Sequence, residues 1–397
     1  MLGFVKLKNA RIFFQFMFIA LFLTGCDTMH KPQSSSIPIL PDPTLQKHSL
    51  PQKRQGEQTL VALLLPFSGS GQEVGKSIMD AAKLALFDLK AQNIILRPYD
   101  TGADANQVIT QAENAIRDGV EVFLGPVFSQ STRAITALAQ QANVPVLSLS
   151  NTPEIANRGI YPLGFNPGEQ TKFLTEYLVE KGYKKIAILA PNTRYAQLAV
   201  ESLKQGAHHA TITREVYYDR STTRFGEHVQ SLLGIAPGHV PNPKDFMDAI
   251  FIPERADKLA QIVEVLAHQG VDFKNIKVFG PDILKEASAS KEILLKGALF
   301  AAPDSVEREK FRKRFMDTYH YEPSEIATIA YDMIALITSF TKEGLKVSNE
   351  ALTQKEGFNG IDGPFRLNVH GEVERRYAIF EVDQGAARII VPPSRHF

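Results

Sequence analysis

The sequence predicts an α/β fold in two lobes, each a mostly parallel sheet flanked by helices, with a multi-crossing hinge between them. Short apolar segments alternate with longer amphipathic ones after residue 57, which is the pattern of βαβ units with right-handed crossovers. The alternation runs in two successive series, and a differently patterned tail follows them. The roughly 340 residues involved are more than one hydrophobic core usually serves. Two lobes, each with its own sheet, are therefore expected.

The first 25 residues have the layout of a secretory signal peptide. Lys6, Lys8 and Arg11 precede a mostly apolar run over residues 12–24. This run is shorter than the roughly 20 residues that a membrane-spanning helix needs. The segment Leu-Thr-Gly-Cys at residues 23–26, at the end of this run, matches the lipobox of bacterial lipoproteins, so Cys26, the only cysteine of the chain, is the predicted lipidation site. The alternative is an ordinary secreted protein with an incidental cysteine.

A lipidated Cys26 would anchor the protein to a membrane without spanning it, because two or three acyl chains hold a protein stably. The body would then face the periplasm. Asp27 directly after the cysteine resembles the signal that retains enterobacterial lipoproteins in the inner membrane, and the choice between inner and outer membrane stays open. Residues 26–57 are polar and contain five prolines, which predicts a tether with a mean reach of roughly 30 Å.

The net charge argues against nucleic acid as a partner. It is +1 for the whole chain, and removing Lys6, Lys8 and Arg11 with the signal peptide changes it to −2, since +1 − 3 = −2. Neither value provides the strongly basic face that nucleic-acid binding usually needs.

The first series begins with a continuous apolar run that ends at Pro66, as expected of a strand buried on both faces. Helices with apolar stripes separate it from the strands that follow. The expected strands are residues 60–65, 93–100, 120–125 and 144–150, and the expected helices are residues 74–89, 105–119 and 131–142.

The second series repeats this order. Its expected helices are residues 168–182, 196–206, 225–233 and 257–270, and its expected strands are residues 184–192, 211–219, 248–254 and 277–282.

The tail must return in part to the first lobe, because it follows a completed second series. Residues 297–304 are expected to cross between lobes, residues 305–319 and 325–340 to form helices, and residues 365–382 to form a hairpin around His370 and Gly371. The predicted boundaries are 58–163 plus 300–364 for the first lobe and 164–299 plus 365–397 for the second.

The order of elements over residues 58–397 resembles the type I periplasmic binding fold of leucine/isoleucine/valine receptors. The segments VALLLPFSGSGQEVG, LGPVFSQST, SLSNTPE and NTRYAQLAVESL carry this resemblance. More narrowly, AKLALFDL, RPYDTGAD and VFLGPVFSQ resemble lipoproteins that activate penicillin-binding proteins. Activators of the enterobacterial type carry a helical-repeat domain before this module, where this sequence has the predicted tether.

Ligands of open α/β sheets bind beyond the carboxyl ends of the strands, near helix amino termini. One such loop contains Ser129, Ser131 and Thr132, whose hydroxyl and backbone N–H groups could hold a carboxylate. The alternative is that Ser129 or Ser131 caps the following helix, worth about 1 kcal/mol.

The next loop contains Ser150 and Asn151. The resemblance implies that this stretch contacts the α-carboxylate and amine of an amino acid, although Asn151 stands where threonine is frequent. The alternative is a simple turn before Pro153.

Two residues of the second lobe complete the candidate set. The resemblance implies that Tyr195 lies against the ligand and that Asp282 lies near an ammonium group. Because a buried carboxylate without a partner is costly, Asp282 would need a ligand or water, and an exposed loop position is the alternative.

The sequence contains no catalytic or metal-binding motif of the GxSxG or HExxH type, so we expect neither an enzyme nor a cofactor or metal site. Two functions are compatible with the resemblance. The first and preferred one is regulation of a peptidoglycan synthase through a lobe surface. The second is a receptor that delivers an amino-acid-like solute to an ABC permease.

Overall fold

The computed structural model describes residues 50–397, apart from Gln55, Ala103, residues 285–292, Asp304, Gln384, Gly385, Arg395 and His396. The predicted signal peptide, Cys26 and most of the predicted tether lie outside the described residues. Within the described part, no helix combines the length and the apolar character needed to cross a membrane.

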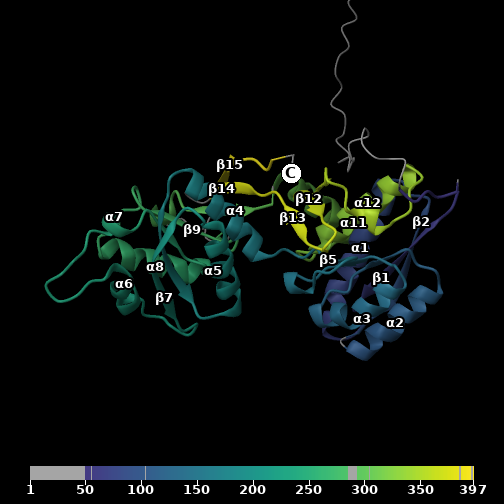
Figure 1. The fold of residues 1–397 in the computed structure, drawn as a ribbon, viewed down its shortest axis with the longest axis horizontal. Coiled ribbons are helices and arrows are strands. Elements are labelled where there is room, and N and C mark those ends of the chain that lie inside the picture. Colours follow the sequence, from purple (N-terminus) through teal and green to yellow (C-terminus); the bar gives the residue numbers. More distant parts are fainter. Residues whose placement is uncertain are drawn as a thin grey trace, which may run out of the picture. The chain divides into compact units, whose positions relative to one another are not determined.

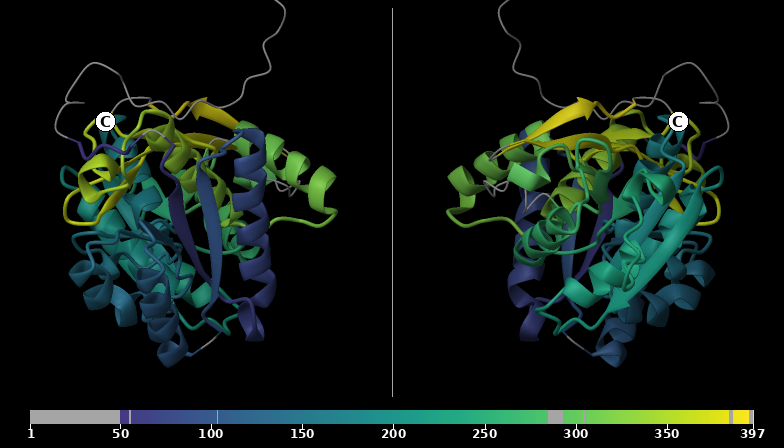
Figure 2. Two further views of the ribbon diagram at one scale, coloured as in Figure 1. Left: turned by 90° about the vertical axis from the view of Figure 1, so that its right-hand side faces the viewer. Right: turned by 90° about the vertical axis from the view of Figure 1, so that its left-hand side faces the viewer.

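The first lobe contains a parallel sheet with the strand order β2-β1-β3-β4-β5. Its strands are β1 (Thr59–Leu65), β2 (Ile94–Asp100), β3 (Val122–Leu124), β4 (Val146–Ser148) and β5 (Ile160–Pro162). The apolar run in β1 is buried on both faces, as its composition predicts. Leu63 faces the core under α1 (Gln72–Asp88) and α11 (Ala327–Lys342), while Leu64 faces the core under α2 (Ala105–Arg117) and α3 (Ser129–Gln141). Figure 1 shows the labelled strands β1, β2 and β5 in the same half of the molecule as α1, α2 and α3. Figure 2 shows α1 running alongside β1 and β2.

The second lobe contains a mixed sheet with the order β15-β14-β10-β9-β8-β6-β7. Strands β6 to β10 pair in parallel, and β14 and β15 add two antiparallel strands at the edge beside β10. The strands are β6 (Lys185–Pro191), β7 (Thr211–Tyr218), β8 (Ala249–Phe251), β9 (Lys277–Gly280), β10 (Leu299–Ala302), β14 (Ala378–Asp383) and β15 (Ala386–Val391). One face packs on α4 (Pro167–Glu180) and α5 (Arg194–Gly206), and the other on α6 (Gly226–Leu233) and α8 (Ala256–His268). The predicted fold class, with a mostly parallel main sheet in each lobe, is confirmed.

The remaining elements complete the two lobes. They are the helices α7 (Pro243–Phe246), α10 (Ser305–Tyr319) and α12 (Asn349–Leu352), the short 3-10 turns η2 (Gly69–Gly71), η3 (Pro153–Ile155) and η4 (Ile293–Leu295), and a small antiparallel sheet of β11 (Phe358–Gly360), β12 (Gly363–Leu367) and β13 (Val373–Arg375).

The lobe boundaries differ from the expected ones at two places. Residues 299–302 form strand β10 inside the second sheet, paired with β9 and β14. Phe365, Leu367 and Val373 of β12 and β13 belong to the core of the first lobe. The hairpin expected around His370 and Gly371 is confirmed, since β12 pairs antiparallel with β13. The alternating pattern does not show that this hairpin packs in the first lobe or that β14 pairs with β10, which is distant in sequence. The chain therefore crosses between lobes after β5, after β10 and between β13 and β14.

Residues 50–54, expected within the tether, contact the body of the first lobe. Gln52 forms a bridge with Leu345, and the backbone N–H of Lys53 donates to the carbonyl of Gly344. The Lys53 ammonium donates to Glu121 at 2.6 Å, and its side chain is only 2% exposed. The ordered body therefore begins before the first strand.

Candidate functional site

A cavity of about 610 Å³ lies between elements of both lobes, and we name it the interlobe cavity. Three of the residues predicted from the sequence line it together. The lining residues are Asn151, Phe165, Gln170, Tyr195, Asp282, Ile283, Ala302, Pro303, Arg308 and Glu325.

Strand ends place the three predicted residues. Asn151 follows β4 of the first lobe, and Asp282 follows β9 of the second. Tyr195 follows β6 and lies in the first turn of α5, which Thr193 caps by accepting from the N–H of Ala196 at 3.2 Å. Since the carboxyl ends of parallel strands form ligand sites in open α/β sheets, these positions agree with the expected location.

A crossing segment fixes the loop that contains Asn151. The N–H of Gly164 donates to the carbonyl of Ser150 at 3.0 Å. A Cβ atom at position 164 would lie 2.6 Å from the backbone nitrogen of Asn151. Only glycine permits this close approach, so the crossing and the Asn151 loop are held together.

The acidic wall of the cavity includes Asp282, whose carboxylate accepts a hydrogen bond from Nε2 of Gln170 at 3.3 Å. Gln170 is 1% exposed, and its Oε1 atom has no hydrogen-bond partner.

The basic group in the wall is Arg308, which already has a counter-charge. Its Nε donates to the fully buried carboxylate of Asp362 at 2.7 Å. Burial acts to lower the pKa of Arg308, but the Asp362 charge and hydrogen bond outweigh it, so the pKa is raised. The guanidinium also lies over the ring of Phe165, 4.9 Å from its centroid, which is a cation–π distance. Arg308 thus connects the cavity wall to the segment after β5, where the chain first crosses between the lobes.

The other predicted hydroxyls lie near the ends of β3 and β4 but do not line the cavity. Thr132 is buried, with its hydroxyl 2.8 Å from that of Ser148. Ser150 is buried, and its hydroxyl accepts from the N–H of Thr152. Ser129 and Ser131 are half-buried in the first turn of α3.

The alternative that Ser129 or Ser131 caps α3 is wrong. Phe128 occupies the N-cap position, and no side-chain hydrogen bond caps the helix. The sequence suggested a cap because serine is frequent there, but the helix begins at Ser129 itself, one residue earlier than a Ser129 cap would need.

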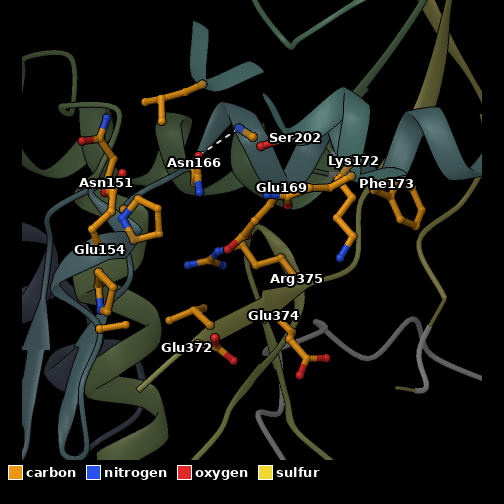
Figure 3. A pocket seen from close by; sticks show the side chains of 18 of the residues that line it. Asn151, Glu154, Asn166, Glu169, Lys172, Phe173, Ser202, Glu372, Glu374 and Arg375 are labelled. Atoms are coloured by element: carbon orange, nitrogen blue, oxygen red, sulfur yellow. Dashed lines mark hydrogen bonds between the residues drawn. The ribbon is translucent and has the colours of Figure 1, made fainter. Parts of the chain in front are cut away.

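A second cavity of about 560 Å³, which we name the hinge-side cavity, lies along α4 and α5, the loop after β4 and residues 372–376 (Figure 3). Figure 3 shows Glu169, Lys172 and Arg375 directed into it. Burial raises the pKa of Glu169 to about 7, although the nearby charge of Arg375 and a hydrogen bond from Tyr377 act to lower it. The hydroxyl of Tyr377 donates to Glu169 at 3.0 Å.

Gln170, Arg308 and Glu169 were not predicted from the sequence. One signal could have identified Gln170, because it precedes Leu174 and Leu178 at intervals of four residues and so lies on the buried face of its helix. A polar residue on an apolar stripe needs a partner. No sequence pattern marks Arg308 as a cavity residue. It lines the cavity because α10, which follows β10 of the second sheet, packs in the first lobe.

Comparison with known sequences agrees with this architecture. The profile of the periplasmic binding protein family matches residues 59–387. An uncharacterized protein of Rickettsia prowazekii, RP748, is 22% identical over 96% of this chain and 97% of its own length. The penicillin-binding protein activator LpoA of Haemophilus ducreyi is 28% identical over 38% of this chain, and the Leu/Ile/Val-binding protein of Citrobacter freundii is 24% identical over 36%. These matches span only 25% of LpoA and 42% of the binding protein.

Solved structures share the fold. A putative branched-chain amino acid ABC transporter protein from Rhodospirillum rubrum has a TM-score of 0.72 at 17% identity, covering 84% of this chain and 100% of that one. LivJ from Streptococcus pneumoniae, in complex with isoleucine, has a TM-score of 0.54 at 20% identity, covering 85% and 100%. A solute binding protein from Rhodopseudomonas palustris, in complex with 3,4-dihydroxybenzoic acid, has a TM-score of 0.54 at 20% identity, covering 84% and 98%.

Proposed function

Because the chain belongs to the periplasmic binding protein family, we propose that it is a lipid-anchored periplasmic protein whose interlobe cavity binds a small solute. One observation carries the proposal. Asn151, Tyr195 and Asp282 follow three different strands in two lobes, and they line one cavity. Cys26 would carry the lipid.

The size and composition of the cavity support a small-molecule ligand. Its volume of about 610 Å³ falls within the roughly 300–1,000 Å³ of ligand sites, and it combines aromatic and apolar walls with a few polar groups. Since its walls come from both lobes, a bound solute would favour their closure around the crossings.

Solute binding fits the family and requires no chemistry at the site, so we propose no catalytic activity. Within the described residues, no group of three or more histidine, cysteine or acidic side chains is arranged to hold a metal ion.

The receptor role follows most directly from the cavity. A receptor of an ABC transporter would close on an amino-acid-like solute and present it to a permease. The sequence alone favours regulation of a peptidoglycan synthase, whereas the cavity lined from both lobes favours the receptor.

Regulation remains the second candidate because of one observation. The similarity to the activator LpoA, 28% over 154 residues, is of the same order as the similarity to the binding proteins. A regulator would contact a synthase through a lobe surface, and a solute in the cavity could accompany that contact.

Calorimetric titration of the purified protein with amino acids, small peptides and aromatic acids tests the proposal. We expect one class of solute to bind, and Tyr195→Ala and Asp282→Asn to weaken it about tenfold or more. Lys313→Met, on the exposed side of α10, is the control and should bind normally. If no solute binds and a peptidoglycan synthase copurifies with the protein, the receptor role is excluded in favour of the regulator.

The anchor has a separate test. Intact mass spectrometry of the protein from the membrane fraction should show cleavage before Cys26 and the added mass of acyl chains. In Cys26→Ala these should be absent, and an unmodified wild-type amino terminus would contradict the anchor.

A further inference from the structure

We infer that Phe397 is a latch between the two lobes, which holds the segment after β15 of the second lobe against the first lobe and so limits rotation about the crossings. Two cation–π contacts carry the inference. The centroid of the Phe397 ring lies 4.8 Å from Cζ of Arg366 and 4.7 Å from Cζ of Arg376. The inference goes beyond the proposed function, because a latch would act in a receptor and in a regulator alike.

The residues that Phe397 contacts belong to the first lobe and to the third crossing. Arg366 lies in β12, which packs in the core of the first lobe. Arg376 lies between β13 and β14, and its N–H donates to the carbonyl of Pro364 at 2.9 Å. In contrast, β15 pairs with β14 in the second sheet. Figure 1 marks this end of the chain beside β12 and β13. Phe397 therefore adds a fourth connection between the lobes.

The first lobe provides a shaped surface for the ring. A Cβ atom at position 357, which is occupied by the buried Gly357, would lie 2.7 Å from Cε2 of Phe397. Only glycine permits an aromatic ring to lie this close to the backbone. Arg366 is held in place by Glu374, to which it donates at 2.6 Å, and by the carbonyl of Lys355 at 3.3 Å. A guanidinium that is already positioned loses little conformational freedom when the ring docks.

The link from the ring back to the second lobe is short and stiff. Val391 ends β15, and the six residues from there to Phe397, since 397 − 391 = 6, span at most about 22 Å when fully extended. Pro392 and Pro393 follow β15 directly, and their fixed φ angles leave the segment few ways to absorb a movement. A rotation that carries β15 beyond this reach from β12 must therefore pull the ring out of its contacts.

The strength of the two contacts makes the latch reversible. One cation–π contact at a partly exposed site shifts an equilibrium about 2- to 5-fold, so two contacts shift it about 5- to 30-fold. Phe397 is half-buried. The ring would then be docked most of the time and still release when the lobes rotate. Phe87 provides a comparison inside the first lobe, since its ring is 74% exposed and lies 5.9 Å from Cζ of Arg314.

Distances between spin labels in the two lobes, measured by double electron–electron resonance on the full-length chain, test the inference. The labels are placed at Lys313→Cys on α10 and Glu264→Cys on α8, two exposed positions. Cys26→Ala removes the only natural cysteine, so only the introduced thiols react. We expect a narrow distance distribution for the parent chain and a broader one for Phe397→Leu. Phe397→Tyr keeps the ring and Phe87→Leu removes an aromatic ring within one lobe, so both should match the parent.

Hydrogen exchange of the chain without labels gives a second readout. The amide of Arg376 donates to Pro364 at the crossing that the ring contacts, so its protection reports local opening there. We expect Phe397→Leu to lower this protection about 5- to 30-fold. If Arg366 acts through the ring, Arg366→Met should lower the protection in the parent chain but change it less than about twofold in the Phe397→Leu background.

Three results would overturn the latch. The first is the same distance distribution for Phe397→Leu as for the parent chain. The second is an equal broadening in Phe87→Leu, which would indicate a general loosening of the protein. The third is a Phe397→Tyr chain that behaves like Phe397→Leu. None of these results bears on solute binding, and a failure of every solute to bind would leave the latch as it stands.

Discussion

Helix α4 lies between two cavities of similar volume, about 610 and 560 Å³. Two consecutive residues of the helix face them, because neighbours on an α-helix point about 100° apart. Gln170 lines the interlobe cavity, where its amide donates to Asp282. Glu169 lines the hinge-side cavity, where it accepts from Tyr377.

The difference between the two cavities lies in the origin of their polar groups. The interlobe cavity gathers Asn151, Tyr195 and Asp282 from strand ends in both lobes, whereas the hinge-side cavity contains only Asn151 of these. Its polar groups come mainly from helix flanks and from residues 372–376. Volume alone therefore does not identify a binding site, and the strand ends favour the interlobe cavity.

Removal of Arg308 should have the largest effect on stability. This residue lines the interlobe cavity but not the hinge-side cavity, and it is paired with a buried carboxylate. Arg308→Met leaves the Asp362 carboxylate, which is fully buried, without its counter-charge. We expect the free energy of unfolding to fall by about 3–5 kcal/mol, measured by urea denaturation. Lys313→Met on the same helix should change it by less than about 0.5 kcal/mol. A loss below about 1 kcal/mol for Arg308→Met would contradict a buried pair.

The hinge-side cavity should respond to pH through Glu169. Its pKa is raised from 4.5 to about 7 in the folded protein, so between these values the folded state binds more protons than the unfolded state. Stability should therefore fall as pH rises through this window, by on the order of 2 kcal/mol after allowing for partial exposure.

The variant Glu169→Gln isolates this contribution, since other groups also titrate. The difference in unfolding free energy between wild type and variant should change across pH 4.5 to 7, measured by urea denaturation at each pH. Tyr377→Phe removes a hydrogen bond that lowers the pKa of Glu169 and should move the window upward. Parallel pH profiles of wild type and Glu169→Gln would contradict the raised pKa.

The third prediction concerns which of the two cavities binds the solute. Asn151 lines both, so Asn151→Ala should weaken solute binding about tenfold, by loss of a polar contact. Glu169→Gln changes only the hinge-side cavity and should alter the affinity less than about twofold. Calorimetric titration of both variants with the same solute gives the comparison, and the reverse ranking would assign the solute to the hinge-side cavity.

The smallest effect concerns the start of α4 itself. Asn166 caps the helix through a hydrogen bond to Gly168, and Asn166→Ala should cost about 1 kcal/mol of unfolding free energy. Ser131→Ala is the matched control, because Ser131 lies in the first turn of a helix that has no side-chain cap. It should change the unfolding free energy by less than about 0.5 kcal/mol. Equal losses in urea denaturation would contradict the assigned caps.

Local patterns in the sequence predicted most of the fold. The apolar run that became β1 and the stripe that became α2 have the bounds expected within a few residues. The hairpin of β12 and β13 was predictable, because these strands are neighbours in sequence. The place of residues 299–302 in the second sheet was not predictable in this way, because it depends on pairing with β9 and β14, which are distant in sequence.

In the candidate site, too, some residues were marked by local patterns, whereas others come together only through contacts distant in sequence. That Asn151, Tyr195 and Asp282 line one cavity was predictable because strand ends and a family resemblance mark these positions; that they bind a solute stays a prediction. The cation–π contact between Arg308 and Phe165 was not predictable from local patterns. It joins α10 to the segment after β5, which are far apart in the sequence.

A crystal structure of the protein with the tightest-binding solute tests the central claim most directly. We expect electron density for the solute between Asn151, Tyr195 and Asp282, in the interlobe cavity. Density beside Glu169 and Arg375 in the hinge-side cavity, with the interlobe cavity filled only by water, would contradict it.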